Sequence, residues 1–358
     1  MIKHLFLIWG LLAALTAEPV LACTSAVVSG KVTPDGRPLL WKNRDTDFMR
    51  NHVDYVKGER YDFIAVVNSA NAYLKEAWMG TNSAGFALMN TQSYNLVDVK
   101  GDEERGAANG RVIYRALEVC ATVEDFCHFL DTISKPSDIE ANFGVIDAQG
   151  GAAMFEVDYY KYVMYDANNP KDAPYGYIAR TNFSFAGKVN EGAGYVRYME
   201  ADQVLMKASA TGNITPQFIF NDLSRSFRNR MLDIDLRSGG YNRPQASGWF
   251  IDQDFIPRSS TSCSVVVQGV KPGVKAELTT MWTLLGYPPT GIAVPLWVKD
   301  AGKLLPGMVR FNKEHEAALL SDWSLRLADR VFSYKQGMGT GRYLNWERLY
   351  SPGKGDGY

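Results

Sequence analysis

Short apolar segments that are typical of β-strands occur in groups in this sequence. Of all the features of the sequence, this grouping limits the possible folds most. The first group is bounded by turn signals and contains five segments, Thr24–Val28, Leu39–Asn43, Phe63–Val67, Ala77–Met79 and Phe86–Asn90. The second group, with a hairpin turn over residues 147–151, contains Asn142–Ile146, Ala152–Val157, Tyr162–Tyr165 and Tyr177–Arg180. The third group contains Ser262–Gln268, Glu277–Leu284 and Gly291–Val298. Grouped strands predict an α+β fold and not a series of βαβ units.

Helical segments lie between the strand groups. The expected helices are Arg111–Val119, Val123–Ile133, Tyr195–Lys207, Pro216–Phe227 and a long amphipathic helix over Glu314–Phe332. Thr122 and Asp125 have the spacing of a helix cap, which predicts a break between the first two helices. Two sheets packed face to face and covered by helices fit this count. The chain shows no repeat, low-complexity block or long linker, so we expect a single domain over residues 23–358.

The first 22 residues have the features of a signal peptide. A short, positively charged start is followed by the apolar run Leu5–Leu15, and Val20 and Ala22 stand at the −3 and −1 positions of a cleavage site. The apolar run is shorter than the roughly 20 residues that a membrane-spanning helix needs. No later segment is long and apolar enough to span a membrane. We therefore expect an exported protein, periplasmic or secreted, that begins at Cys23.

Composition excludes several kinds of partner. Hydrophobic residues make up 46% of the chain and charged residues 22%, with a formal net charge of −1. This balance provides no basic stripe for nucleic acid or an anionic membrane surface. A homo-oligomer is compatible with the sequence. No group of histidine, cysteine and aspartate residues has the spacing of metal ligands, so the sequence implies neither a metal nor a cofactor.

Four cysteines in 358 residues do not form a disulfide framework. Cys120 and Cys127 are too far apart to be bridged on one continuous helix. Because a break is predicted between the two helices, a disulfide between Cys120 and Cys127 is not excluded. Buried free thiols are nevertheless the default expectation. Cys263 is expected to be a core thiol in a strand.

Cys23 stands at the junction between the leader and the first strand. Removal of the leader gives this residue both a thiol and an α-amino group, whose pKa of about 7.7–8.0 suits a general base. A nucleophile and its base are then carried by one residue, and no histidine is needed. His52, His128 and His315 lie in charged or helical contexts that favour surface or packing roles. A lipid anchor on Cys23 is less favoured, because strand residues follow at once where a lipoprotein usually has a flexible tether.

Two stretches carry a resemblance to a known family. The opening of the mature chain, CTSAVVSGKVTPDGRPLLWKNRDTD, resembles the N-terminal nucleophile hydrolases that cleave linear amides. These include choloylglycine hydrolases, penicillin V acylases, acid-ceramidase-like amidases and the acyl-coenzyme A:6-aminopenicillanic acid acyltransferase family. A later stretch, MWTLLGYPPTGIAVPLWV, is more similar to N-terminal-cysteine dipeptidases. The resemblance implies the four-layer αββα sandwich of this class.

The resemblance also implies roles for four residues. Cys23 corresponds to the nucleophile, and Asp45 to the aspartate that orients the α-amino group. Asn90 corresponds to an asparagine of the oxyanion hole, and Asn182 to a second asparagine near the amino group and the substrate. Each has an alternative structural role, because Asp45 could cap a turn and the asparagines could satisfy backbone groups at strand ends.

The sequence departs from the bile salt hydrolase pattern at two places. Lys42 stands where those enzymes have an arginine, while Arg44 is shifted by two positions, and both are candidates for substrate binding. Because successive strand residues alternate between faces, we expect at most one of them to point toward the site and the other to be solvated. The bile salt hydrolases also have a second site arginine later in the sequence. Its position corresponds to Cys263 in this chain, and Arg258 is nearby but out of register.

The sequence thus predicts a secreted amidohydrolase that acts on a small-molecule linear amide through a thioester on Cys23. A dipeptidase or an acyltransferase is an alternative within the same class. A lipid-anchored binding protein without catalytic activity is an alternative outside it.

Overall fold

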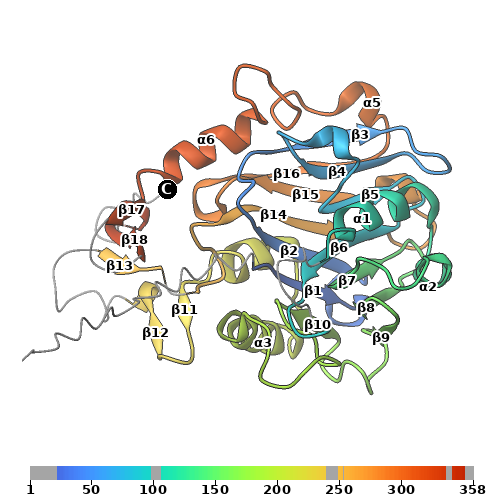
Figure 1. Ribbon diagram of the computed structural model, residues 1–358, viewed down its shortest axis with the longest axis horizontal. Helices are drawn as coiled ribbons and strands as arrows, with labels where there is room; N and C mark the ends of the chain where they lie inside the picture. The colour runs from blue at the N-terminus through green and yellow to red at the C-terminus, as the bar shows by residue number, and fades with distance from the viewer. Residues whose placement is uncertain (1–21, 98–105, 239–248, 253, 336–340, 351–358) are drawn as a thin grey trace, which may run out of the picture.

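The computed structural model describes residues 22–97, 106–238, 249–252, 254–335 and 341–350. Two antiparallel sheets dominate this part of the chain (Figure 1). The six-stranded sheet has the strand order β10-β1-β2-β14-β15-β16, and the seven-stranded sheet runs from β3 to β9 in sequence order. The three predicted strand groups do not each form one sheet, because the first and second groups each contribute strands to both sheets.

The six-stranded sheet contains the strand that begins directly after Cys23. Its strands are β10 (Tyr177–Arg180), β1 (Thr24–Val28), β2 (Leu39–Asp45), β14 (Thr261–Gln268), β15 (Thr280–Leu285) and β16 (Ala293–Leu296). β2 lies between β1 and β14, with Thr24 opposite Asn43 and Cys263 opposite Arg44. The start of β1, the end of β2 and the start of β14 therefore lie side by side at one end of the strands, in the interior of the sheet.

The seven-stranded sheet consists of β3 (Asn51–Val56), β4 (Phe63–Asn68), β5 (Met79–Asn82), β6 (Ala87–Gln92), β7 (Ala141–Ile146), β8 (Ala152–Val157) and β9 (Tyr162–Asp166). The expected hairpin turn joins β7 and β8, where the Asp147 carboxylate accepts hydrogen bonds from the backbone N–H groups of Gln149 and Gly151. β3 was not predicted, because its polar residues interrupt the apolar pattern.

Helices cover the outer face of each sheet. α1 (Asn109–Val119) and α2 (Val123–Thr132) share a buried apolar cluster with the seven-stranded sheet. α3 (Tyr195–Ser209) and α4 (Pro216–Phe218) pack against the six-stranded sheet, and Figure 1 shows α3 beside β10 and β1. The cap between α1 and α2 is present, because Thr122 and Asp125 bond reciprocally to each other's backbone N–H. The predicted α+β fold with four αββα layers is confirmed.

The inner faces of the sheets form the central core. Val27 and Leu40 belong to the apolar cluster between the sheets, whereas Val28 and Trp41 belong to the cluster under the helices. This alternation is what strand geometry requires. A Cβ atom at Gly144 would lie 2.3 Å from the Met89 side chain and 2.7 Å from Leu40, so a glycine permits the close approach of the sheets there.

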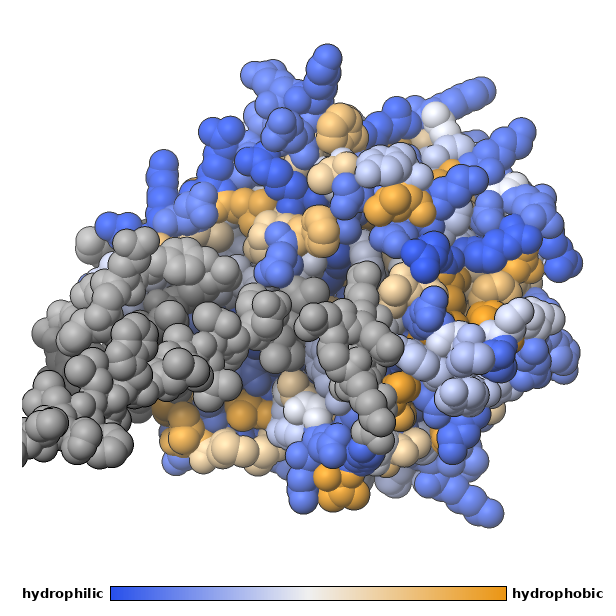
Figure 2. Space-filling view, in the orientation of Figure 1, coloured by the Kyte–Doolittle hydropathy of each residue, from blue (hydrophilic) through white to orange (hydrophobic). Residues whose placement is uncertain are grey.

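Short strands and helices outside the two large sheets complete the described structure. The strands are β11 (Arg228–Asn229), β12 (Ile234–Asp235), β13 (Trp249–Ile251), β17 (Phe332–Lys335) and β18 (Gly341–Asn345), none of which was predicted. The helices are α5 (Ala301–Leu304), α6 (Leu319–Ala328) and α7 (Trp346–Leu349). On the face shown in Figure 2, hydrophilic side chains predominate outside the grey region, and apolar ones form separate groups.

Two predicted helices are shorter in the structure than expected. The expected helix over Glu314–Phe332 is limited to α6, because Glu316 has a left-handed backbone (φ +50°) and Asn312 pairs with Ala317 in an isolated bridge. The expected helix over Pro216–Phe227 continues from α4 as a π-helical turn and ends at Leu223. The next residue, Ser224, shares hydrogen bonds with Trp41 and Ser264 of the sheet, contacts that sequence periodicity does not reveal.

The four cysteines are free, so Cys120 and Cys127 form no disulfide. Cys120 and Cys263 are buried, as expected for core thiols. Within the described part of the chain, no helix combines the length and apolar character needed to cross a bilayer.

Candidate active site

Cys23 immediately precedes β1 and is almost buried, with 8% of its surface exposed. Its Sγ atom lies 3.8 Å from the backbone carbonyl oxygen of Asp45, which ends β2. In the 358-residue chain its nitrogen is an amide nitrogen, bonded to the buried residue Ala22. The pairing of β1 with β2 thus brings the predicted nucleophile and the predicted aspartate together.

The Asp45 carboxylate is bound by side chains. Thr261 Oγ1 donates to Oδ1 at 2.6 Å, and Arg258 Nε forms an ion pair with Oδ2 at 3.0 Å. Burial raises the pKa of Asp45 to about 6, against the opposing effect of the positive charges on Arg258 and Arg197. These contacts differ from those of a turn cap, in which the carboxylate would accept from neighbouring backbone N–H groups.

Arg197, on α3, is a site residue that the sequence did not suggest. Its side chain is fully buried, and Nη1 donates to the carbonyl oxygen of Cys23 at 2.5 Å and to Thr24 Oγ1 at 2.9 Å. Nη2 donates to Asn182 Oδ1 at 3.1 Å. One planar guanidinium therefore holds both the backbone of the predicted nucleophile and one of the predicted asparagines.

Asp254 connects the two arginines of the site. Its Oδ1 accepts hydrogen bonds from Arg197 Nε at 2.8 Å and from Arg258 Nη1 at 2.5 Å. Charges of alternating sign thus run from Arg197 through Asp254 and Arg258 to Asp45. We call these four residues the site ion network. It contacts the carbonyl of Cys23 at one end and contains the Asp45 carboxylate at the other.

Asn182 follows β10 and is fully buried. Besides accepting from Arg197, it donates from Nδ2 to the backbone oxygen of Gln92 at 2.7 Å. The structural role considered from the sequence, satisfying a backbone group at a strand end, is therefore present. The same side chain also reaches the site through Arg197.

Asn90 lies on β6 and accepts a hydrogen bond at Oδ1 from Lys42 Nζ, at 2.9 Å. Because an ammonium group can only donate, this contact fixes which end of the amide faces Lys42. The Nδ2 end, the donor that an oxyanion would need, is turned away from the ammonium group. The structure gives no hydrogen bond between Asn90 and Cys23.

Lys42 and Arg44 are both buried, with 2% and 3% of their surfaces exposed. The expectation that one of them would be solvated was wrong, because residues two apart on a strand share a face. Lys42 Nζ also donates to the carbonyl oxygen of Trp78 at 3.1 Å, and the Arg44 guanidinium lies 4.6 Å from the centre of the Trp78 ring. Burial lowers the pKa of Lys42 to about 8 and that of Arg44 to about 10, while the nearby Cys23 raises both.

The remaining partners of Arg44 are neutral. Nη1 donates to Asn51 Oδ1 at 2.5 Å, and Nη2 donates to Asn68 Oδ1 at 2.8 Å and to Thr46 Oγ1 at 3.5 Å. Cys263, opposite Arg44 in the strand register, has its pKa raised to about 11 by burial and is a neutral thiol. The positive group that the resemblance placed at position 263 is thus absent there, and Arg44 stands directly beside it.

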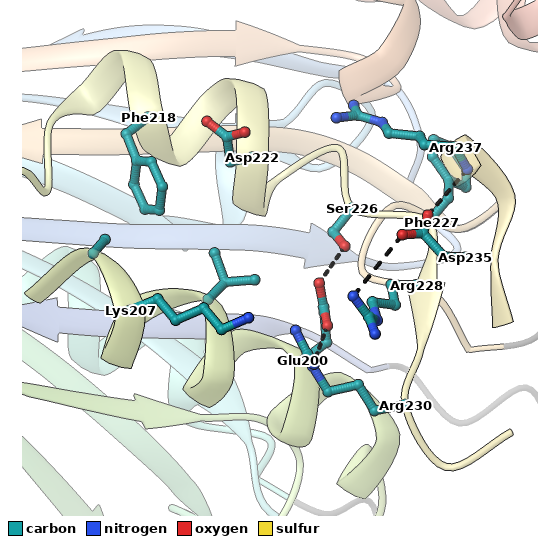
Figure 3. A pocket seen from close by; sticks show the side chains of 12 residues that line it. Glu200, Lys207, Phe218, Asp222, Ser226, Phe227, Arg228, Arg230, Asp235 and Arg237 are labelled. Carbon is teal, nitrogen blue, oxygen red and sulfur yellow. Dashed lines mark hydrogen bonds and ion pairs between the residues drawn. The ribbon is translucent and has the colours of Figure 1, made fainter. Parts of the chain in front are cut away.

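A pocket of about 420 Å³ lies elsewhere, between α3 and the β11–β12 hairpin (Figure 3). Glu200 is at its centre, with Ser226, Arg228, Arg230 and Asp235 around it. None of the predicted site residues lines this pocket. Among the described residues, no group of three or more histidine, cysteine, aspartate or glutamate side chains could hold a metal ion.

Residues 32–217, more than half of the chain, match the family described as acyl-coenzyme A:6-aminopenicillanic acid acyl-transferase. Cys23 lies outside the matched residues. Among curated proteins, no sequence match is found.

Three solved structures are similar to the fold. A mutant of the conjugated bile acid hydrolase from Clostridium perfringens has 12% identity and a TM-score of 0.46, over 78% of this chain and 93% of that chain. A Caenorhabditis elegans ortholog of N-acylethanolamine-hydrolyzing acid amidase has 15% identity and a TM-score of 0.44, over 70% and 94%. Penicillin V acylase from Agrobacterium tumefaciens has 16% identity and a TM-score of 0.41, over 77% and 86%.

Proposed function

The chain belongs to the acyl-coenzyme A:6-aminopenicillanic acid acyl-transferase family, and on that premise we propose that it is an exported enzyme that cleaves a linear amide bond through a thioester on Cys23. The observation that carries the proposal is the arrangement of Cys23 and Asp45 at adjoining strand ends, held by Arg197 and Arg258. A cysteine whose backbone carbonyl is bound by the same ion network that holds the Asp45 carboxylate favours a reactive centre over a lipid attachment site.

The reaction begins with removal of residues 1–22, which converts the nitrogen of Cys23 into a free amine. This amine takes the thiol proton, and the resulting thiolate attacks the amide carbonyl carbon. Asp45, ionised at neutral pH, accepts a hydrogen bond from the amino group and holds it beside the thiol. The hydrogen bond from Arg197 fixes the backbone of Cys23 during this step.

The tetrahedral intermediate carries its negative charge on the former carbonyl oxygen. Asn90 donates from Nδ2 to this oxyanion, with its amide orientation set by the hydrogen bond from Lys42. When the C–N bond breaks, the ammonium group of Cys23 returns its proton to the leaving amine. The acyl group then remains on the sulfur as a thioester. Asn182 supports the geometry of Cys23 through Arg197.

Water completes the cycle by attacking the thioester, and the amino group of Cys23 again accepts and returns the proton. An amine in place of water would give acyl transfer, which the name of the matched family favours as a second function. The two outcomes differ only in the acceptor.

The test is a screen of the mature protein, beginning at Cys23, against conjugated bile salts, N-acyl amino acids, penicillin V and dipeptides. We expect cleavage of at least one amide, and an intact-mass increase equal to the acyl group after rapid acid quenching. Cys23→Ala should show neither. Added hydroxylamine should trap the thioester as an acyl hydroxamate, which reports the acyl-enzyme, whereas release of the free acid without an added amine shows hydrolysis. A diacylglycerol adduct on Cys23 of the native protein would contradict the proposal.

A further inference from the structure

Two buried cations beside Cys23 lack a carboxylate partner. Four cationic side chains in the described part of the chain are almost completely buried, namely Lys42, Arg44, Arg180 and Arg197. Arg180 pairs with Glu156 at 2.6 Å, and Arg197 pairs with Asp254 at 2.8 Å. The other two form no ion pair with any described residue, and each of their hydrogen-bond partners is a neutral oxygen atom.

The pocket in Figure 3 contains two arginines that do have carboxylate partners. There, Arg230 pairs with Glu200 at 2.6 Å, and Arg228 lies 4.0 Å from Asp235. These cations are less buried than Lys42 and Arg44, yet each has a carboxylate. The absence of such a partner beside Cys23 therefore separates Lys42 and Arg44 from the other two almost completely buried cations, Arg180 and Arg197.

Acidic groups near the two cations are engaged elsewhere. The Asp45 carboxylate is bound by Arg258 and Thr261, and Glu76, which raises the pKa of Arg44 through its charge, forms an ion pair with Arg111 at 3.6 Å. The neutral thiol of Cys263 adds no charge.

A thiolate on Cys23 could balance one of the two cations, but not both. Even that charge disappears once the sulfur is acylated, because a thioester is neutral. Burying an uncompensated charge is costly, and buried charges are normally paired. An anion supplied by the bound substrate would pair the cation that the protein leaves unmatched.

We propose that Lys42 and Arg44 form the binding site for a carboxylate carried by the substrate, so that the enzyme prefers acid-bearing amides to neutral ones. This inference rests on the proposed amide-cleaving function and specifies its substrate class. The planar guanidinium of Arg44 suits bidentate contact with a carboxylate, and the ammonium of Lys42 adds a point charge beside it.

Two matched pairs of substrates test the proposal on the mature protein. N-dodecanoylglycine and N-dodecanoylethanolamine differ in charge on the amine side, and N-glutaryl- and N-pentanoyl-4-nitroanilide differ on the acyl side. We expect kcat/KM to favour the acid in at least one pair by about tenfold or more, the factor for a hydrogen bond to a charged group. Arg44→Met and Lys42→Met should each reduce that ratio, whereas Arg44→Lys should preserve most of it. Arg326→Met, which changes an exposed arginine on α6, is the matched control.

A second measurement does not depend on turnover. In the Cys23→Ala protein, calorimetry should show that the acid of at least one pair binds about tenfold tighter than its neutral analogue, and that Arg44→Met removes the difference. Equal affinity for both members would overturn the carboxylate site, as would variants that slow both members equally. Preferential binding without cleavage of any amide would instead leave the carboxylate site standing and contradict the proposed function.

Discussion

Arg197 donates a hydrogen bond from Nη1 to the carbonyl oxygen of Cys23 at 2.5 Å, across 174 residues of sequence. This contact joins the helical layer outside the six-stranded sheet to the residue proposed as the nucleophile. The same guanidinium contacts Asn182 and Asp254, so its planar shape matters as well as its charge.

Arg197→Lys tests this contact. Lysine keeps the positive charge but cannot make the four contacts at once, so we expect a stability loss of about 1–3 kcal/mol, typical of buried donors and acceptors left unpaired. We also expect kcat to fall while KM changes little, because Cys23 would be less well positioned. Thermal melting and steady-state kinetics measure the two effects. Lys207→Met, on the same helix but outside the site ion network, is the control. An unchanged kcat in the folded variant would show that Arg197 only stabilises the fold.

Asp45 should set the acidic limb of the pH profile. Its pKa is raised to about 6, so the carboxylate that holds the amino group is lost as the pH falls below that value. We expect kcat/KM of the wild type to decline on the acidic side with an apparent pKa near 6. Asp45→Asn should have low activity without this limb. An active Asp45→Asn enzyme with the wild-type profile would contradict the assignment.

The raised pKa of Asp45 also predicts the direction in which the stability of the protein changes with pH. Because the pKa is raised in the folded state, ionisation of Asp45 opposes folding, and its contribution to stability is greatest below pH 3.8 and declines up to about pH 6. The charges facing this carboxylate are those of Arg258, Arg197 and Asp254. The melting temperature of Asp45→Asn relative to the wild type should therefore rise between pH 4 and pH 7. A relative fall over that range would show that the ion pair with Arg258 outweighs the cost of burial.

Asn90→Ala separates an oxyanion donor from a structural residue. Loss of one such donor typically lowers kcat by about 10²–10³, and we expect KM to change little. The variant should still be acylated slowly by an activated ester. A large fall in melting temperature with a normal kcat would instead indicate that Asn90 only supports Lys42 and the end of β6.

Glu156→Gln is predicted to affect stability alone. Glu156 forms a buried ion pair with Arg180 and accepts hydrogen bonds from the backbone N–H groups of Phe185 and Ala186, at 2.8 and 2.7 Å. Leaving a buried cation without its partner typically costs about 3–5 kcal/mol. Chemical denaturation measures this loss, and the acidic limb of the pH profile should not move. A displaced limb would mean that Glu156 acts on the site.

Strand periodicity was a reliable guide where a strand is buried on both faces. Thr24–Val28, Ala152–Val157 and Tyr177–Arg180 were predicted with the observed bounds, because continuous apolar runs between turn signals have few alternatives. The short strands β11, β12, β13, β17 and β18 were not predicted, since two to five residues carry too little of a period. The segment Glu314–Phe332 was predicted to be one helix because its apolar residues keep a helical spacing throughout. In the structure, its first residues belong to a turn that is stabilised by the Asn312 side chain.

The candidate site was only partly predictable, because some of its residues come together only through tertiary packing. Cys23 and Asp45 belong to a recognisable stretch, and the pairing of their strands follows from the fold. Arg197 and Asp254 occur in segments whose sequence resembles ordinary surface helix and loop. Their role arises only when α3 packs over the start of β1. The burial of Arg44 could have been predicted, because it shares a strand face with Lys42 and Leu40.

The measurement that tests the central claim most directly compares two forms of the protein that differ by one residue. One form begins at Cys23, and the other retains Ala22, so that the nitrogen of Cys23 stays an amide. Both are mixed with the same cleavable amide, and acyl-enzyme formation is followed by intact mass. We predict a thioester adduct and turnover only in the form that begins at Cys23, since an amide nitrogen cannot accept the thiol proton. Equal turnover by the form that retains Ala22 would contradict the account.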